Sequence, residues 1–154
     1  MKVEELYHGL TEEFYQKIAK DTGLTAEKQK QYEQETIDRY GDPARKHIEE
    51  SHRRVLAMSP QQWDCLKERM HNVYMRVAVC IGLYEPDHHE VQELMCLYYQ
   101  NMCAFFTPNR QAFEGIGILY AEHPGFRKLY EQYHPQLADY LRDAMCVFAH
   151  TQLV

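Results

Sequence analysis

The side chains with the most reactive chemistry in this sequence are five cysteines. They are Cys65, Cys80, Cys96, Cys103 and Cys146. Cys96 and Cys103 are seven residues apart and would share one face of a helix, but no third or fourth ligand lies nearby to complete a zinc site. An odd number of cysteines without a CxxC pair is also unlike the disulfide framework of a secreted domain. We therefore expect reduced, mostly buried thiols and a cytoplasmic protein.

Two adjacent histidines, His88 and His89, precede Glu90 and Glu93. His89 and Glu93 are four residues apart, a spacing that could hold a metal on one helix face, but a solvated helix start explains the same residues more simply. No histidine lies within the most apolar segment, residues 91–106, so haem ligation is not expected either. The sequence predicts no metal and no cofactor.

Catalytic motifs are absent from the sequence. It contains no nucleophile elbow, no phosphate-binding loop and no HExxH motif. Glu114 and Asp143 are most simply surface carboxylates rather than a catalytic pair. We therefore expect a binding protein and not an enzyme.

Length and charge limit the class of protein further. A chain of 154 residues is about one domain, and 45% hydrophobic residues are enough to build a core. The net charge of -6 argues against direct contact with nucleic acid, which requires clustered lysine and arginine. No apolar run approaches the roughly 20 residues that cross a bilayer, so we expect no membrane partner.

The elements that must position any site are predicted to be helices, six or seven of them, because no alternating pattern or hairpin signal indicates a strand. In the first 57 residues, helices are expected over residues 3–18, from Thr25 to Gly41, and from Pro43 to Ala57. Their apolar content is thin, so this segment is predicted to be a mobile arm or lid. The resulting division is an arm over residues 1–57 and a core over residues 58–154, within one structural domain.

The core helices have clearer start signals. Ser59-Pro60 predicts the start of a long helix, and Asp87 with Glu90 predicts a capping box for the central helix over residues 91–106. Thr107-Pro108 is expected to cap a short helix that contains Gly115 and Gly117. Each of these glycines costs about 1 kcal/mol relative to alanine, which indicates close backbone approach or room for a bound molecule. His123-Pro124-Gly125 then breaks the chain, and Pro135 is expected to start the last helix.

Several of these segments together resemble one known family, the TipAS antibiotic-recognition domains. The segments are Pro86-Asp87, Glu90-Val91-Gln92, Phe105-Phe106, residues 115–120, His123-Pro124-Gly125-Phe126 and residues 137–144. The resemblance implies an all-helical, globin-like domain that binds bulky, largely apolar antibiotics in a groove between helices. It also implies either a stand-alone domain that senses or sequesters a drug-like small molecule, or the effector domain of a MerR-type transcriptional regulator. A start at Met1 favours the stand-alone form, and a helical protein-interaction module or a homodimer remains open.

The central helix is apolar on several sides, so it is either enclosed or lines a cavity. Tyrosine combines a flat apolar body with a hydroxyl, and methionine adapts its shape, which suits a pocket for irregular aromatic drugs. Only part of the aromatic set is expected to contact a ligand, and Tyr98, Tyr99, Met102 and Phe106 are the stronger candidates. Trp63 fits either role, and a structural one is favoured. The candidate ligand-binding residues are Trp63, Tyr74, Met95, Tyr98, Tyr99, Met102, Cys103, Phe106, Phe113 and Tyr120.

One departure from the family bears on the chemistry of binding. The family's thiopeptide-binding founder captures its drug covalently with a cysteine close after the aromatic pair, and this chain has Thr107-Pro108 near that place. The nearest thiol, Cys103, lies before the pair. We therefore expect reversible binding, in a groove between the helices that begin near Ser59, Asp87 and Pro108, with the N-terminal arm ordering over the ligand.

Overall fold

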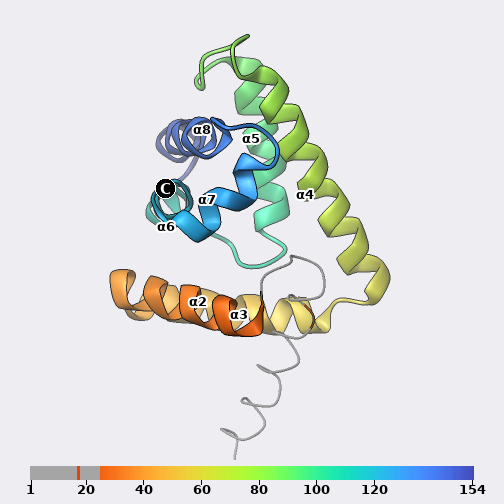
Figure 1. The fold of residues 1–154 in the computed structure, drawn as a ribbon, viewed down its shortest axis with the longest axis vertical. Helices are drawn as coiled ribbons and strands as arrows, with labels where there is room; N and C mark the ends of the chain where they lie inside the picture. Colours follow the sequence, from red (N-terminus) through yellow and green to blue (C-terminus); the bar gives the residue numbers. More distant parts are fainter. Residues whose placement is uncertain (1–16, 18–24) are drawn as a thin grey trace, which may run out of the picture. The chain divides into compact units, whose positions relative to one another are not determined.

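The computed structural model describes residue 17 and residues 25–154, and the described residues form helices without any strand (Figure 1). The elements are α2 (Ala26–Tyr40), α3 (Asp42–Ala57), α4 (Pro60–Cys80), α5 (His89–Met102), α6 (Arg110–Glu122), α7 (Pro124–Glu131) and α8 (Leu137–Gln152). The predicted all-α class is therefore confirmed. The helix expected over residues 3–18 lies outside the described residues apart from Lys17, and a globin-like topology stays a prediction.

The chain divides into two compact units. The first comprises residues 1–63 with Ala104–Phe106, and the second comprises Asp64–Cys103 with Thr107–Val154. In the first unit the Thr25 hydroxyl caps α2, and Gly41, with φ of 80°, ends it as predicted. No residue of α2 is buried, whereas α3 buries His52 and Val55. A contact of 2.9 Å between His52 Nε2 and Glu33 Oε1 joins α3 to α2.

The second unit contains most of the buried side chains, and α6 packs along α8 within it (Figure 1). A Cβ atom at Gly117 would lie 3.3 Å from the Met145 sulfur and 3.4 Å from the Arg142 Cα atom. For the glycines of this helix, the sequence predicted either close approach of a neighbouring backbone or room for a bound molecule. At Gly117 the reason is close approach of α6 to α8.

Several helix starts differ from the prediction. Ser59 does cap α4, since its hydroxyl accepts from the Gln62 amide at 3.1 Å and Gln62 Oε1 accepts from the Ser59 amide. The Asp87–Glu90 capping box was wrong. The cap of α5 is His88, whose Nδ1 accepts from the Glu90 amide at 3.2 Å while its ring stacks on Tyr84 at 4.1 Å. This stacking holds the imidazole over the first turn.

The central helix also ends earlier than expected, at Met102, so Phe105 and Phe106 lie beyond it. Pro108 disfavours helical geometry at the preceding residue, which makes a helix through residue 107 unfavourable. The predicted Thr107-Pro108 cap was wrong too, because Asn109 caps α6 by accepting from the Ala112 amide at 2.8 Å. The last helix begins at Leu137 rather than at Pro135. Within the described residues, no helix combines the length and the apolar character needed to cross a bilayer.

Arg127 ties three helices of the second unit together. Its guanidinium donates to both oxygens of Asp139 on α8, at 2.8 and 2.7 Å, and to the Ala121 carbonyl near the end of α6, at 2.9 Å. The same side chain reaches Glu131 along α7. The Arg127 guanidinium holds the pKa of the Asp139 carboxyl below its ordinary value, through these hydrogen bonds first and then through its charge.

We predict that Asp139→Asn removes a pH-dependent part of the stability. A depressed carboxyl pKa in the folded state stabilises the fold above the unfolded value of about 3.9, and this contribution disappears as pH falls through the lower folded value. Because the pair is partly exposed to solvent, the expected loss at neutral pH is about 1 kcal/mol. Urea unfolding of both proteins from neutral pH down to acid should show the two stabilities converging. A constant difference would contradict this origin.

We also predict that Gly117→Val destabilises the chain by roughly 1–3 kcal/mol, because the added atoms have no space between α6 and Met145. Gln111→Val is the matched control, since it places valine at an exposed position of the same helix. Chemical denaturation of both variants separates the packing cost from the helix propensity of valine. Equal effects would show that α6 and α8 do not approach closely at Gly117.

Candidate functional site

Aromatic rings from five helices of the second unit form one connected network. Its centre is Tyr74 on α4, whose ring centroid lies 5.7 Å from Tyr98, 5.3 Å from Tyr130 and 5.4 Å from Tyr133. Ring pairs at these distances attract each other through their edges and faces, beyond the burial of apolar area. We call the connected rings the tyrosine network.

The tyrosine network extends from Tyr74 in two directions. Through Tyr98 it reaches Phe113 at 6.1 Å, and Phe113 contacts both Tyr99 at 5.6 Å and Phe148 at 5.5 Å. Through Tyr130 it reaches Tyr120 at 5.4 Å, which in turn contacts Phe126 at 4.9 Å. One arm therefore ends in phenylalanines of α6 and α8, and the other carries hydroxyls to the junction of α6 and α7.

The hydroxyls of this network are neutral. Burial raises the pKa of Tyr74, Tyr98, Tyr120 and Tyr130 above the ordinary value, and neighbouring tyrosines add to the shift for Tyr98 and Tyr130. A phenol in this state donates or accepts hydrogen bonds but does not act as a base or a nucleophile at neutral pH. The site can therefore recognise polar groups of a ligand without supplying a charge.

The hydroxyl of Tyr98 is unusual among these groups. The Tyr98 side chain is fully buried, and the hydroxyls of Tyr74 and Tyr130 lie close enough to its own to shift its pKa, but not in the geometry of a well-aligned hydrogen bond. A poorly aligned bond offsets only part of the roughly 1–3 kcal/mol that burying a polar atom costs. The Tyr98 hydroxyl is thus a weakly satisfied polar group of the network.

The network reaches the surface at its rim. His71 Nδ1 lies 2.7 Å from the Tyr133 hydroxyl, and the His71 side chain is exposed. Tyr120, Phe126 and Tyr133 are half-buried, unlike Tyr98 and Phe113 at the centre. A ligand would meet the half-buried rings first.

Half of the residues predicted from sequence meet in this network: Tyr74, Tyr98, Tyr99, Phe113 and Tyr120. Met95 and Met102 are buried on α5, and Cys103 is half-buried at its C-cap. Trp63 and Phe106 belong to the first unit, where Trp63 meets Phe105 edge-on at 6.4 Å and His47 stacks on Phe106 at 4.4 Å. Of the predicted arm, residues 1–57, the structure describes residue 17 and residues 25–57, and its ordering over a ligand stays a prediction.

Sequence reasoning missed Tyr130, Tyr133 and Phe126 as site residues. Their spacing of four and then three places them on one face of α7 and its following turn, the same periodicity that identified the central helix. A tyrosine on an apolar helix face needs a polar partner for its hydroxyl, and this requirement would have grouped Tyr130 and Tyr133 with Tyr74.

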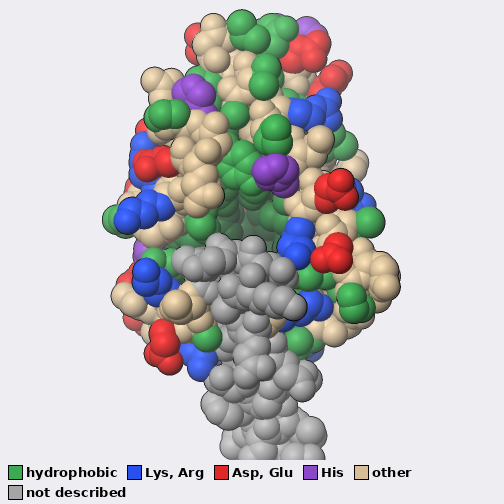
Figure 2. All heavy atoms as spheres, turned by 45° about the vertical axis from the view of Figure 1, so that its right-hand side comes forward, with side chains coloured by type: hydrophobic (Ala, Val, Ile, Leu, Met, Phe, Trp, Pro, Cys, Tyr) green, Lys and Arg blue, Asp and Glu red, His purple; other side chains and the backbone are tan. Residues whose placement is uncertain are grey.

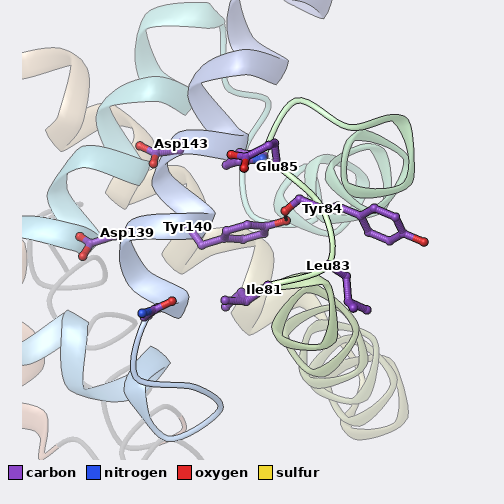
Figure 3. A pocket seen from close by; sticks show the side chains of 10 residues that line it. Ile81, Leu83, Tyr84, Glu85, Asp139, Tyr140 and Asp143 are labelled. Atoms are coloured by element: carbon purple, nitrogen blue, oxygen red, sulfur yellow. Dashed lines mark hydrogen bonds between the residues drawn. The ribbon is translucent and has the colours of Figure 1, made fainter.

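Apart from the tyrosine network, an open depression lies between α8 and the turn after α4 (Figure 3). This open depression of about 530 Å³ is bordered by Glu85, Asp139 and Asp143, and the Tyr140 hydroxyl crosses it to donate to the Tyr84 carbonyl at 2.8 Å. Asp139 is already committed to Arg127, and among the described residues no group of histidine, cysteine and carboxylate side chains is arranged to hold a metal. We assign this depression a structural role.

Comparison with known proteins was made against family models, curated sequences and solved structures. The model of the TipAS antibiotic-recognition domain matches residues 32–148. The chain is 26% identical over 127 residues to the HTH-type transcriptional activator mta of Bacillus subtilis (strain 168), covering 82% of this chain and 48% of that protein. It is 27% identical over 130 residues to the HTH-type transcriptional regulator SkgA of Caulobacter vibrioides (strain NA1000 / CB15N), covering 82% and 51%. The chain thus spans about half the length of these relatives, and no solved structure matches it significantly.

We predict that Tyr98→Phe stabilises the unliganded protein by about 1 kcal/mol, because the substitution removes a weakly satisfied buried hydroxyl and keeps the ring. Tyr140→Phe is the matched control. It loses the hydrogen bond to the Tyr84 carbonyl and should destabilise the protein by about 1 kcal/mol. Thermal and urea unfolding of both variants will measure the signs, and a destabilised Tyr98→Phe would show that this hydroxyl makes a well-aligned hydrogen bond after all.

Proposed function

Because this chain belongs to the TipAS antibiotic-recognition domain family, we propose that it binds a bulky, largely apolar and aromatic small molecule, such as a peptide antibiotic, without changing it chemically. The observation that carries the proposal is the tyrosine network, in which Tyr74 contacts three other tyrosine rings and further contacts connect rings from five helices. Such a surface offers a flat ligand both ring faces and ring edges.

The absence of charge in the network favours an uncharged ligand. All four buried hydroxyls are neutral, so a charged group entering among them would lose its hydration without gaining a counter-charge. Amide, hydroxyl or azole groups, in contrast, exchange hydrogen bonds with phenols. Peptide antibiotics rich in aromatic and amide groups have this composition.

We propose that such a ligand lies in a hollow of the surface. Figure 2 shows hydrophobic side chains on the floor of a hollow in one face of the molecule. Small-molecule sites are concave and mostly apolar, with few polar groups that orient the ligand. Half-buried Tyr120, Phe126 and Tyr133 are the parts of the network from which binding would begin.

Binding rather than catalysis is the function we propose, since tyrosines with raised pKa values supply neither a base nor a nucleophile. Reversible binding is part of the proposal. Cys103, the thiol nearest the Phe105-Phe106 pair, is half-buried at the C-cap of α5 and lies beside the Tyr99 hydroxyl, whose pKa is raised by burial and by this thiol.

The relatives favour one particular use of a bound ligand. Both are HTH-type transcriptional proteins by name, and this chain matches about half of each. We therefore propose a ligand-sensing module whose occupancy is read by a transcriptional regulator in the cytoplasm. Sequestration of a drug by the domain itself is the second candidate, favoured by the antibiotic-recognition character of the family. Both depend on the same binding step.

The test is a thermal-shift screen of peptide antibiotics and polyaromatic drugs, followed by calorimetric titration of each compound that raises the melting temperature. Tyr120→Leu removes a ring from the network while keeping apolar volume, and it should weaken binding about two- to tenfold. Tyr40→Leu is the control, because Tyr40 is exposed on α2 and lies outside the network.

Two results would contradict the proposal. If no compound in the screen raises the melting temperature, the ligand-binding function fails for this chemical class. If Tyr40→Leu weakens binding as much as Tyr120→Leu does, the ligand binds elsewhere on the protein.

A further inference from the structure

Exposed apolar side chains concentrate on one face of the second unit. Met75 and Val79 on α4 are 51% and 69% exposed, Leu83 in the following turn is 67% exposed, and Leu97 on α5 is 39% exposed. Tyr84, 38% exposed, joins them. We call these five residues the α4–α5 apolar face. The other large apolar side chains exposed among the described residues, Tyr40 and Val154, lie outside this face.

The α4–α5 apolar face forms a ridge beside a depression. Met75, Val79 and Leu83 follow each other at intervals of four, so they lie along one side of α4 and its extension. Figure 3 shows Leu83 and Tyr84 directed away from α8, that is, away from the interior of the unit. Between this ridge and α5 lies an open depression of about 490 Å³, to which Val79, Leu94 and Leu97 contribute. Clustered exposure of this kind marks an interaction surface, whereas single exposed apolar residues do not.

Both signs of charge border the same depression. Arg76 lies on its α4 side, and Glu90 and Glu93 lie on its α5 side. Within the described residues, no ion pair joins Arg76 or Glu93 to another side chain. A partner of one uniform charge would meet attraction on one side of the depression and repulsion on the other.

We propose that the occupant of the α4–α5 apolar face is a second copy of this chain, packed with its α4 antiparallel to the first about a two-fold axis. A two-fold contact requires a surface that is complementary to itself, with apolar residues in the middle and both charge signs at the border. Antiparallel packing about Val79 places Met75 opposite Leu83 of the other copy.

The same arrangement accounts for the charges. α4 and α5 run in opposite directions on either side of the turn that joins them (Figure 1), so the two-fold operation brings Arg76 of one copy toward Glu90 and Glu93 of the other. Each contact is made twice. A stable interface buries roughly 800 Å² per partner, in general with about 20–30 residues a side, so a contact centred on these five side chains is expected to be weak.

The test is sedimentation velocity of the full chain over a dilution series. We expect the wild type to shift from monomer to dimer with rising concentration, and Val79→Glu to remain monomeric. Val154→Glu is the matched control, because Val154 is fully exposed and lies outside the face. It should dimerise as the wild type does. Circular dichroism and melting curves establish that both variants are folded.

A charge reversal tests the orientation separately. Arg76→Glu should weaken the dimer, and combining it with Glu90→Arg and Glu93→Arg should restore it, because the reversed charges pair again across the two-fold axis. A wild type that stays monomeric at its highest soluble concentration, or a dimer that survives Val79→Glu, would overturn the proposal. A partner of another kind would appear as the first of these results.

Discussion

The contacts of the Tyr74 ring are the interaction on which the second unit depends. This one side chain touches rings from α5, from α7 and from the turn after α7. α7 has only eight residues and would not persist alone, because helices this short are marginal in water. Tyr130 on one side of α7 and Arg127 on another fix it, so an aromatic contact and a bidentate ion pair together position a helix that the chain could not otherwise hold.

Building a core from tyrosine rather than phenylalanine has a consequence for recognition. Each buried ring brings a hydroxyl that must find a partner or remain unsatisfied, and burial keeps all of them uncharged. In the proposed function, the hydroxyls that are costly to bury would also make binding selective, because a neutral ligand with hydrogen-bonding groups exchanges hydrogen bonds with phenols. Stability and the proposed recognition would then depend on the same side chains.

The sequence predicted the helical class, the helices near residues 25–41 and 43–57, and the start of α4, because capping and periodicity are local signals. It misplaced the starts of α5, α6 and α8, where the side chain that caps is chosen by its surroundings. His88 caps α5 because Tyr84 stacks on its ring, a contact across a turn that spacing does not reveal. For the candidate site, the residues of α5 and α6 were predictable from their apolar spacing. Tyr130 and Tyr133 were not recognised, because only the packing of α7 against α4 brings them to Tyr74.

α5 is apolar on several sides because adjacent residues serve two different surfaces, one in the interior of the unit and one on its outside. Tyr98 points into the tyrosine network while Leu97, one residue earlier, is 39% exposed, and on α4 the adjacent pair Tyr74 and Met75 divides in the same way. Each helix thus carries a ring for the interior and an aliphatic group for the α4–α5 apolar face. Since a helix moves as a rigid rod over a few turns, a displacement of α4 or α5 that admits a ligand at the rings also moves Met75 and Leu97. The proposed ligand binding inside the unit and the proposed association at its surface would then share the same two helices.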